Sequence, residues 1–210
     1  MAFSVRHTPV TTLLLAAIAA MFLVEIRAGG ATGEVLYALG ANHPVAVLQQ
    51  GEWWRLFTSM FLHGGFAHVL LNGWALYQLG ALFEMAVGSF RMLVVYVLAG
   101  LAGSLASLLW TQSLSVGASG AIFGVLGALI AFLLRRRERL TPFARSLLSQ
   151  LVGWAVINVF IGFTVPMIDN AAHLGGCAAG FLLGLLLRGR QAEQRPEPSP
   201  PAPLPRVGEG

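Results

Sequence analysis

The amino-acid sequence predicts an all-α polytopic membrane protein that crosses the bilayer six times. Of its 210 residues, 56% are hydrophobic and only 10% are charged, whereas a soluble domain carries about 25% charged residues. Six apolar runs approach the roughly 20 residues that a helix needs to cross a bilayer. They comprise residues 10–26, 67–87, 92–110, 116–134, 147–165 and 171–187. We expect one membrane domain over residues 1–190.

The first apolar run, residues 10–26, follows Arg6. A secretory signal peptide also has a basic residue before its hydrophobic region, so this run could be such a signal. That hydrophobic region is typically 7–15 residues long and ends at a small-residue cleavage site. This run is longer and ends in Glu25 and Arg27. We therefore expect a retained helix.

The arginines indicate the orientation of the six runs, because cytoplasmic loops of membrane proteins carry an excess of basic residues. All thirteen basic residues are Arg. With a cytoplasmic N-terminus, only Arg27 and Arg55 lie outside. The other arginines then lie inside: Arg6, Arg91, Arg135, Arg136, Arg137, Arg139, Arg145, Arg188, Arg190, Arg195 and Arg206. Six crossings put the C-terminus in the cytoplasm as well.

The segments between and after the runs carry further information. Residues 28–66 form the longest outer segment, and Trp53, Trp54 and Phe57 suit the headgroup level. Residues 191–210 are rich in Pro, Glu and Arg, which predicts a disordered cytoplasmic tail. No basic stripe with interleaved aromatic residues is present, so we expect no nucleic-acid partner. The single cysteine, Cys177, excludes an intrachain disulfide.

A few polar residues lie within the apolar runs, where they are costly and therefore candidates for function. The second, fourth and sixth runs cross in the same direction. Near their outer ends stand His68 and Asn72, Ser119, and His173 respectively, so all four side chains share one shallow depth. The remaining polar residues are Glu84, Asn158, Asp169 and Asn170, with His63 just before the second run.

The spacing of these residues predicts that the fourth and sixth runs meet. His68 and Asn72 are four residues apart and share one helical face, as Ser119 and Phe123 do. Small residues allow membrane helices to approach closely. Such an approach would bring Ser119 to within 2.6–3.2 Å of His173, the distance that a nucleophile and its base require. The glycines concerned are Gly117, Gly120, Gly124 and Gly127 in the fourth run, and Gly176, Gly180 and Gly184 in the sixth.

These residues resemble the motifs of the rhomboid family of intramembrane serine proteases. Gly117-Ala118-Ser119-Gly120 resembles the family's Gly-x-Ser-Gly motif, and His68 with Asn72 resembles its His-x-x-x-Asn motif. Ala172-His173-Leu174-Gly175-Gly176 resembles the histidine-bearing last helix, and Trp54-Arg55 the Trp-Arg pair of the first loop. The resemblance extends from about Trp53 to Gly184 and implies a minimal six-helix, rhomboid-like bundle of bacterial type.

The resemblance also implies roles. Ser119 would be the nucleophile and His173 the base, whereas His68, Asn72 and the backbone N–H of Ser119 would stabilise the oxyanion. Gly117, Gly120 and Phe123 would support the site, with Phe123 where many members have tyrosine. The substrates would be transmembrane segments of other membrane proteins, and the orientation given by the arginines predicts cleavage near the outer face of the membrane. The lack of Lys and the abundance of Arg, Ala and Gly indicate a bacterial source and hence the plasma membrane. No cofactor and no metal ion is implied.

Other interpretations of these residues remain open. Ser119 could be a small packing residue, and His63 with His68 could be metal ligands, although a metal site needs three or four ligands. Glu84, at the inner end of its run, fits a structural hydrogen-bonding role, and Cys177 fits packing. For the whole protein, the alternatives are a catalytically inactive rhomboid-like protein that binds membrane clients, and a small transporter or channel.

Overall fold

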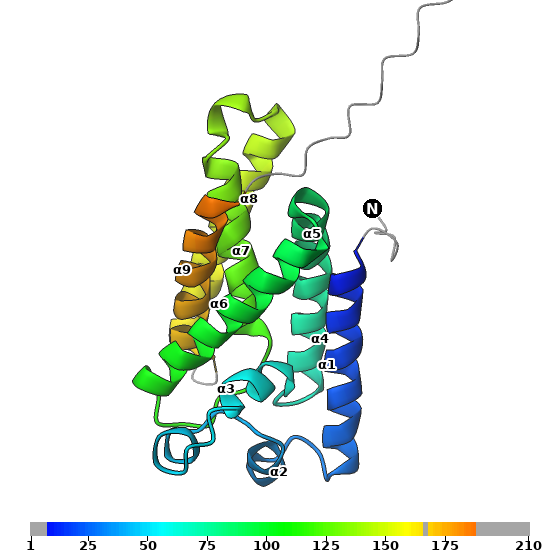
Figure 1. Ribbon diagram of the computed structural model, residues 1–210, viewed down its shortest axis with the longest axis vertical. Coiled ribbons are helices and arrows are strands. Elements are labelled where there is room, and N and C mark those ends of the chain that lie inside the picture. The colour runs from blue at the N-terminus through cyan, green and yellow to red at the C-terminus, as the bar shows by residue number, and fades with distance from the viewer. Residues whose placement is uncertain (1–7, 166–167, 188–210) are drawn as a thin grey trace, which may run out of the picture.

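The computed structural model describes residues 8–165 and 168–187, and most of these residues are helical (Figure 1). The one departure toward β structure within them is an antiparallel bridge between Asn42 and Ser115. The predicted tail, residues 191–210, lies outside the described part of the chain.

Each of the six predicted runs corresponds to helix. The helices in these runs are α1 (Pro9–Arg27), α4 (Phe66–Ala75), α5 (Ala81–Val87), α6 (Ser89–Trp110), α7 (Ser119–Leu134), α8 (Pro142–Thr164) and α9 (Asn170–Leu186). A π-helical turn, η3 (Leu76–Gly80), joins α4 to α5, so these three elements form the second run. By length and composition, α1, α6 and α8 are clear membrane spans, whereas α7 and α9 are shorter apolar helices of 16 and 17 residues.

Local residues explain where these helices begin. Thr141 caps α8 by accepting a hydrogen bond from the Ala144 N–H at 3.2 Å. Helix α7 begins at Ser119, three residues after the predicted start of the fourth run. The reason is Gly117, whose φ of +130° is incompatible with a helix.

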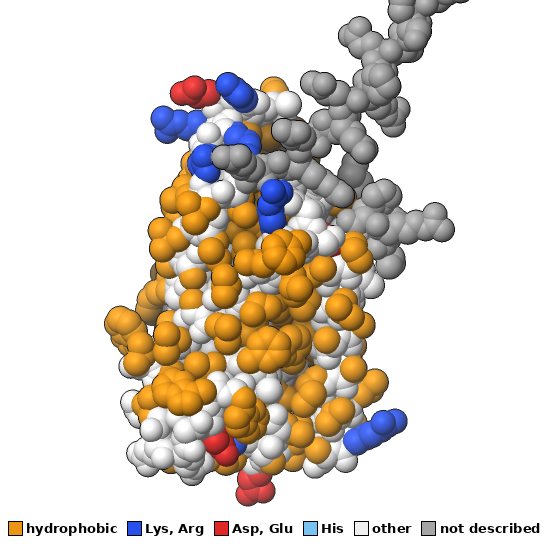
Figure 2. All heavy atoms as spheres, viewed as in Figure 1, with side chains coloured by type: hydrophobic (Ala, Val, Ile, Leu, Met, Phe, Trp, Pro, Cys, Tyr) orange, Lys and Arg blue, Asp and Glu red, His pale blue; other side chains and the backbone are white. Residues whose placement is uncertain are grey.

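Helix α7 is the centre of the bundle, because every residue from Gly120 to Leu133 is buried. It packs most extensively against α9 and α6. Helix α8 is peripheral, since Leu151 and Gly162 are its buried residues. The side chains facing solvent or lipid along the bundle are mostly apolar, and Figure 2 shows them as a broad hydrophobic band between charged groups at the two ends. Such a band fits a protein surrounded by lipid.

Glycines set the distance between α7 and α9, as the sequence predicts. A Cβ atom added to Gly176 would lie 2.0 Å from the carbonyl oxygen of Gly120, and one added to Gly180 would lie 1.9 Å from that of Gly124. The next contact in the same register is Gly184 against the Ala128 carbonyl, at 2.4 Å. The two backbones are therefore in direct contact over three successive turns.

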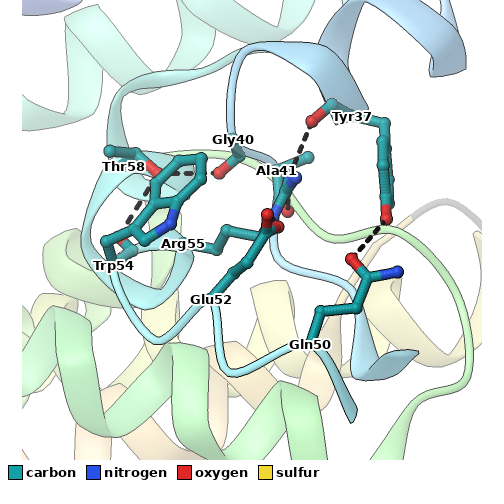
Figure 3. Close-up of polar contacts among 8 residues, drawn as sticks. All are labelled: Tyr37, Gly40, Ala41, Gln50, Glu52, Trp54, Arg55 and Thr58. Carbon is teal, nitrogen blue, oxygen red and sulfur yellow. Dashed lines mark hydrogen bonds and ion pairs between the residues drawn. The ribbon is translucent and has the colours of Figure 1, made fainter. Parts of the chain in front are cut away.

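The segment between α1 and α4 folds into short helices at one end of the bundle (Figure 1): α2 (Gly33–Ala38), η1 (Val45–Gln49), α3 (Arg55–Thr58) and η2 (Ser59–Phe61). Arg55 is buried among them. Its guanidinium donates to the carbonyls of Tyr37 and Ala41 at 2.6 and 3.1 Å and pairs with Glu52 at 2.5 Å (Figure 3). Arg55 therefore holds together three parts of this segment.

Candidate active site

The three predicted runs that carry the candidate residues begin at the same end of the molecule. In Figure 1 the N-terminal ends of α4, α7 and α9 all point toward the end of the bundle at which the short helices α2 and α3 lie. Asn42 pairs with Ser115 through two backbone hydrogen bonds of 3.0 and 2.9 Å, which attaches the loop before α7 to the segment after α2. These two bonds fix the position of the loop that leads into Ser119.

Ser119 is the first residue of α7 and lines a small cavity of about 20 Å³ with Ser59, Ser104, Ser115 and Asp169 among its neighbours. A space of this size holds about one water molecule. The first four backbone N–H groups of a helix have no partner inside the helix. The N–H of Ser119 is one of these, and such donors suit a developing negative charge.

Gly117 lies between Ser119 and His68. A Cβ atom at Gly117 would lie 2.9 Å from Nε2 of His68 and 3.7 Å from Oγ of Ser119. Together with its φ of +130°, this crowding leaves room only for glycine. The His68 ring and the Ser119 hydroxyl therefore border the same point in space.

Hydrogen bonding fixes which nitrogen of His68 carries the proton in the neutral ring. The backbone N–H of Gly64 donates to Nδ1 of His68 at 3.2 Å. A nitrogen that accepts a hydrogen bond has no proton of its own, so the proton of the neutral imidazole is on Nε2. Nε2 and the adjacent Cε1 are the ring atoms that face Gly117. His68 consequently presents an N–H donor on the side of Ser119.

His173 lies on α9, the helix in direct contact with α7, and on the face of α9 that packs against α7. Its ring stacks on the ring of Phe123, with centroids 4.2 Å apart and planes inclined by 9°. Ala172, the residue before His173, packs against Gly120, the residue after Ser119. Within the described residues no hydrogen bond joins Ser119 to His173, and in unliganded sites such bonds are often long.

Asn72, the second residue of the His68 motif, is buried on α4. Its Nδ2 donates to the carbonyl oxygen of His68 at 3.0 Å. This bond lies within α4 and uses one of the two protons of the amide group. His68 is therefore separated from Ser119 only by Gly117. Asn72 lies one helical turn after His68 on α4.

Comparison with known proteins shows the family to which this chain belongs. Residues 50–190 match the family model described as the Rhomboid domain. The chain belongs to the rhomboid family. It is 36% identical to the putative rhomboid protease YdcA of Bacillus subtilis over 188 residues, which cover 87% of this chain and 90% of YdcA.

Two longer relatives match only in part. The chain is 42% identical over 166 residues to the rhomboid protease GluP of Bacillus subtilis, covering 79% of this chain and 32% of GluP. It is 40% identical over 160 residues to RHOMBOID-like protein 5 of Arabidopsis thaliana, covering 74% of this chain and 51% of that protein. The chain thus spans about a third to a half of the length of these two relatives.

In this rhomboid, Asp169 connects α9 to the loop before Ser119. Its Oδ1 accepts the Ala172 N–H at 2.9 Å and caps α9. Its Oδ2 accepts the hydroxyls of Ser107 at 2.5 Å and Ser115 at 2.7 Å. The sequence places Asp169 one turn before His173 but does not indicate these serine partners. Ser107 lies 62 residues and Ser115 lies 54 residues before Asp169.

Three other features of the described residues bear on the sequence predictions. An apolar groove of about 370 Å³ runs along α8 and reaches the ring of Phe123, with Cys177 in its wall. Among residues 8–165 and 168–187, no three His, Cys, Asp or Glu side chains gather closely enough to hold a metal ion. Glu84 has the structural role that the sequence predicts, accepting hydrogen bonds from Val10 N–H, Thr11 N–H and the Thr11 hydroxyl at 2.7–3.0 Å.

Proposed function

We propose that this rhomboid is an intramembrane serine endopeptidase that cleaves transmembrane segments of other membrane proteins with a Ser119–His173 dyad. The observation that carries the proposal is the direct contact between α7 and α9, which brings the turn of Ser119 against the turn of His173. The Phe123 ring beneath His173 orients the imidazole. The relatives named as rhomboid proteases support the same reaction.

The reaction follows from these groups. Ser119 Oγ attacks the carbonyl carbon of the scissile peptide while neutral His173 takes the hydroxyl proton. The negative charge on the former carbonyl oxygen is stabilised by the Ser119 N–H and by the Nε2–H of His68, with the amide of Asn72 as a further donor. The C–N bond then breaks as His173 returns its proton to the leaving amine. A water molecule then gives a proton to His173 and attacks the acyl carbon, and the ester bond to Ser119 Oγ breaks as His173 returns that proton to Oγ.

The surroundings of the dyad suggest how it works within a bilayer. We propose one membrane domain over residues 1–190 with six crossings, both termini in the cytoplasm, and the site near the outer face of a bacterial plasma membrane. The distribution of arginines supports this orientation, because the arginines at 135–139 lie at the opposite end of the bundle from Ser119. The shallow position of Ser119 would give water access to it.

Cleavage of a model transmembrane substrate by the protein reconstituted in liposomes tests the proposal. The parent should cleave, Ser119→Ala should not, and Ser149→Ala, a change at an exposed serine of α8, should cleave like the parent. EDTA should leave the rate unchanged, because the dyad needs no metal ion. Cleavage by Ser119→Ala at the parental rate would refute the dyad, as would activity lost to EDTA and restored by zinc.

A further inference from the structure

Glu25, near the end of α1, is a buried carboxylate outside the dyad and its proposed oxyanion donors. Its side chain is fully buried. Oε1 accepts a hydrogen bond from the backbone N–H of His63 at 2.9 Å, across 38 residues of sequence. Oε2 has no hydrogen-bond partner among the described residues. A buried carboxylate is costly, so its single contact with the turn before α4 needs an explanation.

The turn that Glu25 holds is the one that contacts His68. Its first residue, His63, donates its backbone N–H to Glu25, and its second residue, Gly64, donates its backbone N–H to Nδ1 of His68. The two N–H groups belong to adjacent residues. The side chain of His63 adds a second restraint, because its Nδ1 bonds to the Phe61 carbonyl at 3.2 Å and its ring meets that of His68 edge-on at 5.1 Å.

The Gly64 N–H is the group that keeps the proton of His68 on Nε2. If the turn shifted, Nδ1 would lose its donor, and the ring would be free to rotate or to carry its proton on Nδ1. The Nε2–H would then no longer be held toward Gly117 and Ser119. The acceptor at Glu25 is therefore linked, through two adjacent peptide groups, to the donor on His68.

We propose that Glu25 is a positioning residue for the oxyanion donor His68, acting through the His63–Gly64 backbone. The proposal rests on the proposed protease function and deepens it. It requires a hydrogen-bond acceptor at the end of the residue-25 side chain, and it does not require a negative charge. Glu25 itself touches neither the substrate nor Ser119.

Three substitutions test the need for an acceptor. Glu25→Gln keeps an oxygen at the same reach and should retain most of the parental kcat. Glu25→Leu removes the acceptor, and Glu25→Asp withdraws it by one methylene. Both should lower kcat by about tenfold to a hundredfold with little change in KM, which is less than the 10²–10³ expected for losing the donor itself. Glu34→Leu, a change at an exposed carboxylate of α2, serves as the control and should have parental kinetics.

A double-mutant cycle separates positioning from a general structural role. In a His68→Ala background, Glu25→Asp or Glu25→Leu should cause little further loss of kcat, because the group that Glu25 positions is gone. A further loss as large as that in the parent would overturn the proposal. So would a Glu25→Gln protein as impaired as Glu25→Leu, or Glu25→Asp and Glu25→Leu proteins with parental kcat.

The position of the His68 proton can be read without any catalysis. In the Ser119→Ala protein labelled with ¹⁵N-histidine, the ring nitrogens of His68 should show a protonated Nε2 and an accepting Nδ1, and Glu25→Asp should disturb this pattern. If the pattern is present and responds to Glu25 while the parent fails to cleave, the proposed function is wrong and the positioning stands. If Ser119-dependent cleavage is found and the pattern ignores Glu25, the positioning is wrong and the function stands.

Discussion

The substitution Gly176→Ala should separate the two helices that carry the dyad. The added Cβ would lie 2.0 Å from the carbonyl oxygen of Gly120, whereas ordinary contact begins at 3.4 Å. The backbones of α7 and α9 must therefore move apart by about 1.4 Å. A displacement of about 1 Å in an active site can reduce the rate by roughly 10². We expect a loss of kcat of that size, with a loss of stability of about 1–3 kcal/mol from overpacking.

The assay compares kcat on a model transmembrane substrate with the thermal midpoint in detergent. Gly184→Ala clashes with the Ala128 carbonyl at 2.4 Å, two turns beyond Gly176, so it should lower stability with a smaller loss of kcat. Gly153→Ala is the matched control, because a Cβ on Gly153 meets nothing within 4 Å. It should leave kcat unchanged and stabilise α8 slightly. Parental kcat in Gly176→Ala would refute the idea that this contact sets the geometry of the dyad.

Three further predictions concern stability, measured as the thermal midpoint in detergent. Arg55→Lys should lower stability by about 1.5–3 kcal/mol, because one ammonium group cannot reproduce both the bonds from Nη1 to two backbone carbonyls and the bond from Nε to Glu52; an unchanged midpoint would contradict this. Glu84→Leu leaves the N–H groups of Val10 and Thr11 and the Thr11 hydroxyl without an acceptor, so a loss of roughly 3 kcal/mol or more is expected, and parental stability would show that these contacts are dispensable. Burial lowers the pKa of His63 from 6.5 to about 4, so the unfolded chain takes up a proton before the folded protein does, and stability should fall by up to about 3 kcal/mol between pH 6.5 and 4. His63→Gln should remove that part of the pH dependence, and an identical pH dependence in this variant would exclude His63 as its source.

Features that repeat at helical spacing were predictable from the sequence. The glycines of α7 and α9 predict close packing of these two helices, and the structure has it. The structure also stacks Phe123 on His173, two residues that the sequence assigns to one site through the rhomboid motifs. Each of the two helices can be recognised from its own residues, so these predictions do not require knowledge of a particular contact between distant parts of the chain.

Features that depend on single long-range contacts were not predictable. Nothing in the sequence near Glu25 indicates that its carboxylate bonds to the His63 backbone, because the contact is created by the packing of α1 against the turn before α4. The bonds of Asp169 to Ser107 and Ser115 are similar. The late start of α7 depends on the positive φ of Gly117, and the sequence shows the glycine without showing its conformation.

Labelling by a fluorophosphonate, which reacts with activated serine hydroxyls, tests the central claim most directly. The purified protein is treated with the probe in detergent, digested, and mapped by mass spectrometry. The account predicts an adduct on Ser119 that disappears in Ser119→Ala and is strongly reduced in His173→Ala, whereas Ser149→Ala labels like the parent. Absence of an adduct on Ser119 in protein that cleaves substrate, or labelling of Ser119 unaffected by His173→Ala, would contradict the Ser119–His173 dyad.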